Sequence, residues 1–281
     1  MRREAPEEAL ARVVAEALAE DFGDRGDITT NAIVPAGTPM TGAIRSREAG
    51  RIAGVDAVRL VLARLPEPAS ATLVVRDGAD VEAGATVARL EGSARTLLSG
   101  ERVMLNILGR LSGIATATAA VVRAVEGTGV AVKDTRKTTP GLRTLEKYAV
   151  AAGGGVNHRS GLYDAVLIKD NHIAVAGSIA AAVARARSAL GADFPIQVEV
   201  DTLAQLEEAL GCKVTAVLLD NMPPARLREA VALVNGRCHT EASGGITPAN
   251  VRTVAETGVD SISLGWLTHS ARSLDLGLDI A

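Results

Sequence analysis

The sequence predicts an α/β protein in which a parallel sheet or barrel follows a smaller part with an antiparallel sheet. After residue 126, short β-branched or leucine-rich runs that end in polar residues alternate with helical patterns. Such alternation is typical of βα units that build a parallel sheet. In the first half, residues 73–92 alternate apolar and polar side chains between Asp-Gly and Ala-Gly turns, which favours a small antiparallel sheet.

The first half of the chain begins with an amphipathic helix. Over residues 6–21, apolar side chains recur at helical spacing and the glutamates lie away from them. The segment DFGDRGDITT then breaks the pattern with glycines and aspartates. Short β-like segments are expected from 40 to 95, interrupted by one helix at 54–65, and a long helix is expected at 99–126.

The second half has a regular rhythm of strands and helices. Strands are expected at 165–169, 196–200, 215–220, 239–243 and 261–265, and helices at 178–190, 202–210, 223–234 and 247–257. The strand-end positions Glu199, Asp220, Ser243 and Gly265 are separated by 21, 23 and 22 residues. Equal spacing places them at equivalent carboxyl ends of successive strands, where α/β barrels build their sites.

Charge and composition exclude some classes of partner. The net charge is −3 and aromatic residues make up 2% of the chain, so nucleic acid and anionic membranes are poor candidates. No apolar run is long enough to predict a signal peptide or a membrane span. Cys212 and Cys238 form neither a CxxC pair nor a dense framework, so we expect a cytoplasmic location.

Lysines are concentrated in one segment. The chain has five lysines against 25 arginines, and four of the five lie between Lys133 and Lys169. A compact ammonium suits phosphate binding or proton transfer. Clustering on a solvated helix would give the same pattern, so the lysines alone do not indicate a binding site.

Two loops carry candidate cations for an anionic ligand. In DTRKTTPGLR, Arg136 and Lys137 lie beside three threonines and a Pro-Gly turn. In GGGVNHR, three glycines permit close backbone approach and precede His158 and Arg159. Guanidinium forks and an ammonium suit carboxylate or phosphate groups, although either loop alone could be a solvated turn.

The strand ends add a cation and two acids. Lys169 closes the run AVLIK, where pairing with Asp170 is the structural alternative. Glu199 and Asp220 could hold Mg²⁺, bind sugar hydroxyls or act as acid and base. No His or Cys flanks them at the spacing of a zinc site.

Two strand–glycine–helix junctions indicate a phosphate site. They are SGGIT at 243–247 and LGWLT at 264–268. Backbone N–H groups and a helix N-terminus at such junctions can bind phosphate, whereas a tight turn that needs glycine is the plain alternative. Two junctions on consecutive strand ends favour phosphate.

These motifs together resemble the quinolinate phosphoribosyltransferase family. The matching segments are DTRKTTPGLR, GGGVNHR, GLYDAVLIKDNHI, VEVDTLAQLEEAL, VLLDNM, EASGGIT and LTHSA with LDLGLDI. The resemblance implies a type II phosphoribosyltransferase with an open, TIM-like α/β barrel at 113–266 and a smaller N-terminal α/β sandwich domain at 1–112. The tail 267–281 is expected to return to that domain.

The resemblance also implies a reaction and an assembly. The reaction transfers the phosphoribosyl group of phosphoribosyl pyrophosphate to quinolinate with decarboxylation, giving nicotinate mononucleotide, pyrophosphate and CO₂ in de novo NAD biosynthesis. Mg²⁺ is the implied cofactor. The implied assembly is a homodimer, or a larger oligomer, with each barrel mouth covered by the N-terminal domain of its neighbour.

Residue roles follow from the same resemblance. The implied ligands of the pyridine dicarboxylate are Arg136, Lys137, His158 and Arg159, with Arg102 of the partner subunit, and Thr135 is a further implied substrate-binding residue. Lys169, Glu199 and Asp220 are the implied catalytic residues: Lys169 reaches between the two substrates, and the acids bind ribose hydroxyls and Mg²⁺. The implied frame of the 5′-phosphate is Ser243, Gly244, Gly245, Leu264, Gly265 and Trp266.

Three other interpretations share parts of the pattern. A relative associated with molybdenum transport has the barrel and several motifs but would not need the complete cation set. A Schiff-base lyase would also use a lysine such as Lys169 at a barrel strand end. The hairpin at 73–92 resembles biotinyl and lipoyl carriers, but residues 1–132 contain no lysine to carry a cofactor.

Trp266 departs from the family, which usually has a small residue there.

Overall fold

The computed structural model describes residues 4–280, and the chain divides into two compact units. The first unit comprises residues 4–119, 138–154 and 266–280, and the second comprises 120–137 and 155–265. The predicted domain boundary between residues 112 and 113 falls inside one continuous helix, α4 (Ala94–Ala124). The division into domains at that position stays a prediction.

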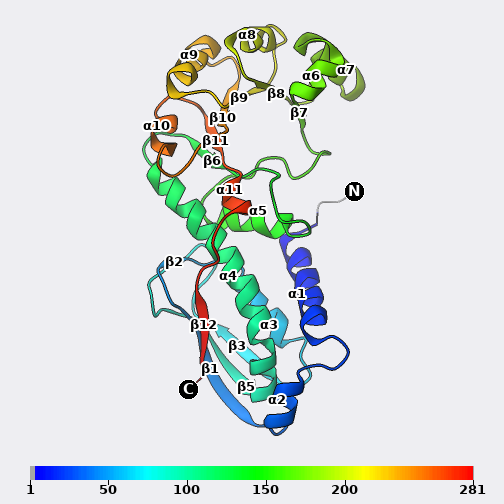
Figure 1. Ribbon diagram of the computed structural model, residues 1–281, viewed down its shortest axis with the longest axis vertical. Helices are drawn as coiled ribbons and strands as arrows, with labels where there is room; N and C mark the ends of the chain where they lie inside the picture. Colours follow the sequence, from blue (N-terminus) through cyan, green and yellow to red (C-terminus); the bar gives the residue numbers. More distant parts are fainter. Residues whose placement is uncertain (1–3, 281) are drawn as a thin grey trace. The chain divides into compact units, whose positions relative to one another are not determined.

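The first unit contains a four-stranded antiparallel sheet with the strand order β12–β1–β5–β3 (Figure 1). Its strands are β1 (Pro39–Ser46), β3 (Ala69–Leu73), β5 (Thr86–Ser93) and β12 (Leu276–Ile280). A separate pair is formed by β2 (Gly50–Arg51) and β4 (Asp80–Val81). Strand β12 comes from the end of the chain and pairs with β1, Ile44 opposite Leu278.

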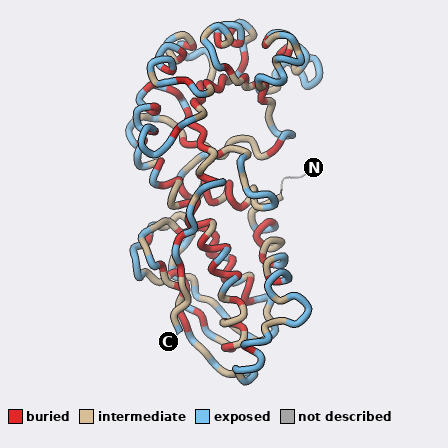
Figure 2. Tube along the Cα trace, viewed as in Figure 1, coloured by how far each residue is buried: buried red, intermediate tan, exposed pale blue. Residues whose placement is uncertain are grey.

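Helices supply most of the core of the first unit. They are α1 (Pro6–Phe22), α2 (Ile28–Ile33), α3 (Asp56–Leu62), α4, α5 (Arg143–Ala152) and α11 (Trp266–His269). The apolar face of α4 is buried along most of this unit (Figure 2), with Leu97, Met104 and Leu108 fully enclosed. The C-terminal segment approaches α4 at Gly113, where a Cβ would lie 2.0 Å from the carbonyl oxygen of Arg272. Only glycine permits that approach.

Two features of the first unit differ from the sequence prediction. The long helix predicted at 99–126 begins five residues earlier, because no turn signal separates strand β5 from Ala94 and the helix follows the strand directly. Helix α5 was not predicted, since its glutamate and lysine are buried rather than exposed. By length and composition alone α4 could cross a membrane, but 61% of its apolar window is buried within the protein.

The second unit is a six-stranded parallel sheet with helices outside it (Figure 1). The strand order is β6–β11–β10–β9–β8–β7, with all pairings parallel. The strands are β6 (Ala131–Lys133), β7 (Val166–Ile168), β8 (Ile196–Val200), β9 (Ala216–Asp220), β10 (His239–Ser243) and β11 (Ser261–Ser263). No ladder joins β6 to β7 among the described residues, so the barrel is open, as predicted.

Four of the outer helices overlap their predicted spans, whereas the helix at 170–176 was not predicted. The outer helices are α6 (Asp170–Ala176), α7 (Ile179–Leu190), α8 (Leu203–Gly211), α9 (Pro224–Val234) and α10 (Val251–Ala255). Helix α10 is much shorter than the predicted span 247–257. The amide of Thr247 donates to Oδ1 of Asn250 at 2.8 Å, and this turn delays the helix to Val251.

Candidate active site

The register of the parallel sheet aligns polar residues at the carboxyl ends of the strands. Ser243 pairs with Asp220 on one side and with Ser263 on the other, and Ser263 pairs with Lys133. Residues in register point to the same face of a sheet. The inner face at this end is therefore polar, and the predicted strand-end site has the geometry expected of a barrel mouth.

Lys169 and Glu199 form an ion pair at this mouth. Lys169 follows strand β7 and caps α6, and its Nζ lies 2.5 Å from Oε2 of Glu199. The Lys169 side chain is 44% exposed and that of Glu199 is 13% exposed. The lysine side of the pair is therefore accessible to a ligand, whereas the Glu199 carboxylate is largely buried.

Asp220 lies in a field of other acids. Burial raises its pKa above the ordinary aspartate value, and the neighbouring Glu199 and Asp201 raise it further, while Lys169 opposes them. Its Oδ2 accepts a hydrogen bond from Nδ2 of Asn221 at 2.7 Å. A cation placed at these carboxylates would relieve the repulsion that raises the pKa.

The carboxylate oxygens of Glu199 and Asp220 suit Mg²⁺ as ligands. Mg²⁺ prefers oxygen ligands and usually takes one or two carboxylates plus water and substrate phosphates. Within residues 4–280, no group of three or more His, Cys, Asp or Glu side chains could hold a metal alone. Glu199 and Asp220 therefore fit a magnesium ion whose remaining ligands come from water and substrate.

Two predicted cationic loops are brought together through Asp134. This buried aspartate follows β6, and its carboxylate accepts hydrogen bonds from Nδ2 of Asn157 and the amide of His158, both at 2.8 Å. As a result Arg159 lies near Arg136. Burial lowers the pKa of Arg159, and the positive charge of Arg136 lowers it further. Two crowded guanidinium groups would be stabilised by a dianionic ligand.

The other residues of the first loop are less enclosed. Thr135 uses its Oγ1 to accept the amide of Lys137 at 3.0 Å, which fixes the turn. Lys137 is exposed. Arg159 donates from Nη1 to the carbonyl oxygen of Ala165 at 3.1 Å, which ties its guanidinium to the start of strand β7.

The first glycine junction has a backbone that only glycine can adopt. Gly244 has a φ of 86°, and a Cβ there would lie 2.1 Å from Oδ1 of Asn221. Asn221 itself has a φ of 53°, and its amide donates to the carbonyl oxygen of Ser243 at 2.8 Å. The strand ends β9 and β10 are thus locked together, with Gly245 exposed beside them.

The predicted helix dipole at the phosphate site is not supported by the helix lengths. Helix α10 has five residues and α11 has four, too short for an appreciable macrodipole. Backbone N–H groups of the Gly244–Gly245 turn remain the available donors. At the second junction the amide of Leu264 already donates to the carbonyl oxygen of Lys133 at 2.9 Å.

Two predicted site residues belong to the first unit. Arg102 is exposed on α4, and Trp266 is the first residue of α11. The remaining predicted residues, from Thr135 to Gly265, belong to the second unit. The roles assigned to all of them stay predictions.

Sequence reasoning missed a polar cluster inside the barrel, centred on the buried Glu241. Glu241 on β10 accepts hydrogen bonds at Oε2 from Nζ of Lys133 at 2.9 Å and from Nε2 of Gln197 at 3.3 Å. Nε2 of His239 lies 3.3 Å from Nζ of Lys133 and 2.8 Å from Oγ of Ser261. The signal was available: His239, Glu241 and Ser243 occupy every second position of one strand, with Thr240 and Ala242 between them, and this period of two places them on one face.

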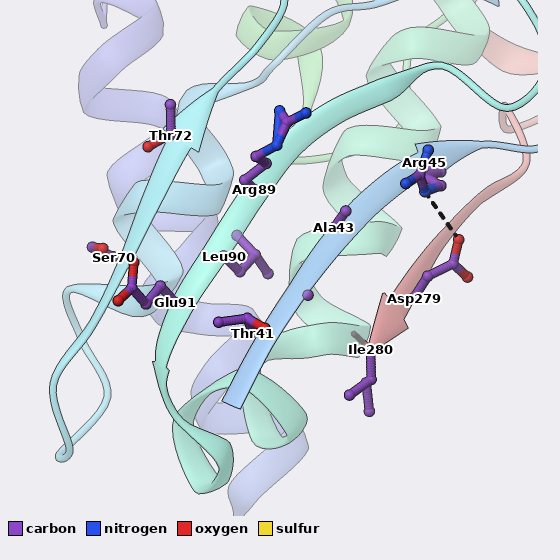
Figure 3. A pocket seen from close by; sticks show the side chains of 11 residues that line it. Thr41, Ala43, Arg45, Ser70, Thr72, Arg89, Leu90, Glu91, Asp279 and Ile280 are labelled. Carbon is purple, nitrogen blue, oxygen red and sulfur yellow. Dashed lines mark ion pairs between the residues drawn. The ribbon is translucent and has the colours of Figure 1, made fainter. Parts of the chain in front are cut away.

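Two hollows lie elsewhere, in the first unit. One, of about 500 Å³, lies over the outer face of the antiparallel sheet and includes Arg45, Arg89 and Glu91, with Nε of Arg45 3.5 Å from Oδ2 of Asp279 (Figure 3). The other, of about 360 Å³, is lined by residues of α1, α3 and α5 with Asp77 and Tyr148. Neither contains any of the cations or acids gathered at the barrel mouth.

An open parallel barrel with paired arginines, a lysine–glutamate pair and a second acid at its mouth is the architecture of an enzyme for anionic substrates. Comparison with known proteins specifies the family. Residues 114–279 match the quinolinate phosphoribosyl transferase C-terminal domain, and residues 27–112 match the N-terminal domain of the same family. The chain belongs to the quinolinate phosphoribosyl transferase family, which confirms the predicted resemblance.

Individual relatives agree with this assignment. The chain is 47% identical to the nicotinate-nucleotide pyrophosphorylase [carboxylating] of Mycobacterium leprae, over 97% of the chain and 98% of the relative. It is 44% identical to the probable enzyme of that name from Bacillus subtilis, covering 96% and 93%. The crystal structure of nicotinate-nucleotide pyrophosphorylase from Ehrlichia chaffeensis matches with a TM-score of 0.93 and 43% identity, covering 96% and 98%. These matches confirm the predicted fold.

Proposed function

We propose that this protein transfers the phosphoribosyl group of phosphoribosyl pyrophosphate to quinolinate and releases CO₂, giving nicotinate mononucleotide for NAD biosynthesis. The names of its relatives support this reaction. The proposal is supported by two charged groups of the second unit. Arg136 and Arg159 crowd together, and Lys169 pairs with Glu199 beside Asp220.

Electrostatics explain why such a site suits these substrates. Quinolinate and phosphoribosyl pyrophosphate together bring about six negative charges at neutral pH, which only a focused cationic site can hold side by side. Arg136 and Arg159 would bind the two carboxylates by bidentate hydrogen bonds. Binding would relieve the repulsion that lowers the pKa of Arg159.

The remaining groups act at the sugar and the phosphates. Lys169 would stabilise negative charge between the two substrates, and Glu199 and Asp220 would lie near the positive charge that develops on the sugar. When bound by these acids, Mg²⁺ would stabilise the departing pyrophosphate. Amides of the Gly244–Gly245 turn would hold the 5′-phosphate.

Decarboxylation needs little further chemistry from the protein. Once the ring nitrogen carries the sugar it is quaternary and positive, and it stabilises the carbanion left when the neighbouring carboxylate departs as CO₂. That carbanion then takes a proton from water to give the mononucleotide. The main contribution of the protein is orientation, which can supply up to about 7–11 kcal/mol. A Schiff-base role for Lys169 fits less well, since that role needs a neutral amine and Lys169 forms an ion pair with Glu199.

A product assay tests the proposed function. Purified protein with quinolinate, phosphoribosyl pyrophosphate and Mg²⁺ is expected to release mononucleotide and CO₂ in equal amounts. Chelation of the metal should stop both, and renewed Mg²⁺ should restore them. Mononucleotide without CO₂, or no product with any preparation that retains its fold, would contradict the proposal.

We also propose a homodimer in which Arg102 of the partner subunit completes each site, in a reducing cytoplasm that suits the two free cysteines. Arg102→Ala and Lys169→Ala homodimers should each be almost inactive. Refolded together in equal amounts, half the dimers are mixed and each mixed dimer has one intact site. About a quarter of wild-type activity should return, measured by the same product assay, and no recovery on mixing would contradict a shared site.

A further inference from the structure

Both ring nitrogens of His158 already have partners. Nδ1 accepts a hydrogen bond from the backbone amide of Arg159 at 2.8 Å, and Nε2 lies 3.3 Å from Oε1 of Glu241. A ring nitrogen that accepts an N–H bond carries no proton, so the single proton of the neutral imidazole is on Nε2 and faces the carboxylate. No ring nitrogen is left to bind a substrate carboxylate.

Glu241 is built as a fixed anchor for this histidine. Its side chain is 1% exposed, and its other oxygen is held by Lys133 and Gln197 from strands β6 and β8. Burial alone would raise the pKa of Glu241, but the neighbouring His158 and Lys133 outweigh burial and lower this pKa to about 2. The Glu241 carboxylate is therefore ionised near neutral pH.

Arg159 needs such an anchor. Its pKa is lowered by burial and by Arg136, so the guanidinium stays beside a like charge only if the backbone and side chain are restrained. The restraints are the bond from its amide to His158, the bond from its Nη1 to the carbonyl oxygen of Ala165, and the bond from the amide of His158 to Asp134.

We infer that Glu241 and His158 are positioning residues for Arg159. Glu241 fixes His158 in the Nε2–H tautomer, and Nδ1 of His158 then fixes the amide of Arg159. The guanidinium is thereby aimed at the dicarboxylate. This inference rests on the proposed function for the identity of the ligand, and it replaces the expected direct contact between His158 and quinolinate.

The tautomer can be measured without any enzyme assay. In ¹⁵N-labelled protein, long-range ¹H–¹⁵N correlation spectra are expected to show a protonated Nε2 and an unprotonated Nδ1 for His158 near neutral pH. The signal is assigned by its loss in His158→Gln. A protonated Nδ1, or protons on both nitrogens, would overturn the inference even if the enzyme makes the expected product.

Kinetics of Glu241→Gln test the positioning role. Misplacing Arg159 should lower kcat/KM for quinolinate about 10–100-fold, mainly through KM, while KM for phosphoribosyl pyrophosphate stays within about threefold. If burial of unpaired Lys133 prevents folding, Glu241→Gln combined with Lys133→Met removes both charges. This double variant should show the same difference between the effects on the two KM values. Equal changes in the two KM values, or no change in either, would reject the role.

A neighbouring carboxylate provides the matched control. Asp260 accepts hydrogen bonds from the amide and the hydroxyl of Thr240, both at 2.7 Å. Thr240 directly precedes Glu241 in the chain. Asp260→Asn should reduce stability and leave both KM values unchanged. If it raises KM for quinolinate as much as Glu241→Gln does, the effect is general loosening of β10 and the inference fails.

Two substitutions of His158 distinguish the roles of its two ring nitrogens. An asparagine oxygen can replace Nδ1 as acceptor for the Arg159 amide, whereas a glutamine side chain reaches toward Glu241 in place of Nε2. His158→Asn should therefore retain a lower KM for quinolinate than His158→Gln. Equal losses would indicate that the ring acts on the substrate directly. If wild-type protein makes no mononucleotide, the proposed function fails, and the tautomer measurement still decides this inference.

Discussion

Replacing Lys169 with alanine is expected to lower the turnover rate for mononucleotide formation roughly 10²–10³-fold. Its ammonium is the positive charge nearest to Glu199, and its side chain is 44% exposed, so the substitution leaves no cavity in the core. The loss should therefore be in the chemical step and not in folding. Initial rates at saturating substrates, with far-ultraviolet circular dichroism and the melting temperature, provide the measurement.

The same variant should change the pH profile in a defined direction. Lys169 lowers the pKa of Asp220, opposing the effects of burial, Glu199 and Asp201. Without Lys169 that pKa rises further, so Asp220 loses its charge at a higher pH as the solution is acidified. The acid limb of the residual activity should shift to higher pH.

An exposed arginine on the same unit serves as control. Arg226 pairs with Glu229 on α9 at 2.7 Å, and its side chain is 51% exposed. Arg226→Ala should keep wild-type turnover and an unchanged acid limb, since exposed pairs contribute little. Near-normal turnover of Lys169→Ala would show that Lys169 is not a catalytic residue. The proposed mechanism would then lack its central cation.

The strand-end acids were predictable because parallel βα units repeat. Glu199 and Asp220 are 21 residues apart, which is one strand with its crossover, and the observed register places both at the same end of the sheet. The period of the chain alone supplies that information. The resemblance then supplied the roles that spacing cannot give.

Contacts between distant loops could not be derived in the same way. Arg136 and Arg159 come together because Asp134 is buried and accepts two donors from residues 157 and 158. In the sequence, Asp134 is only a polar residue at the start of a loop. Whether such a carboxylate faces solvent or another loop depends on the tertiary fold, as it does for Glu241.

Local hydrogen bonds also changed the boundaries of a helix whose approximate position the apolar periodicity predicted. The helix predicted from residue 247 starts at Val251, since Asn250 bonds back to Thr247 and forms a turn. Asn and Asp compete with helical bonding in this way. The consequence is functional, because a five-residue helix cannot supply the dipole expected at the phosphate site.

Removing the carboxylate of Glu146 is expected to destabilise the first unit by about 3–5 kcal/mol. Glu146 on α5 is fully buried and accepts hydrogen bonds from Nη2 of Arg110 at 2.6 Å and from the amide and hydroxyl of Thr139 at 3.0 and 2.8 Å. Arg110 also donates to the carbonyl oxygens of Ala271 and Thr268. In Glu146→Ala the guanidinium and the Thr139 amide lose a charged acceptor that water cannot readily replace.

Urea unfolding followed by circular dichroism measures this loss. An exposed glutamate of the same unit, Glu16, whose carboxylate lies 3.2 Å from Arg12, provides the control, and Glu16→Ala should change the free energy of unfolding by less than about 1 kcal/mol. Replacing both partners, Arg110→Met with Glu146→Leu, should recover much of the loss, because the cost comes from a buried unpaired charge and not from a missing attraction. A double variant no more stable than Glu146→Ala would mean that the bonds from Arg110 to Thr268 and Ala271, and not its pairing with Glu146, fix the C-terminal segment.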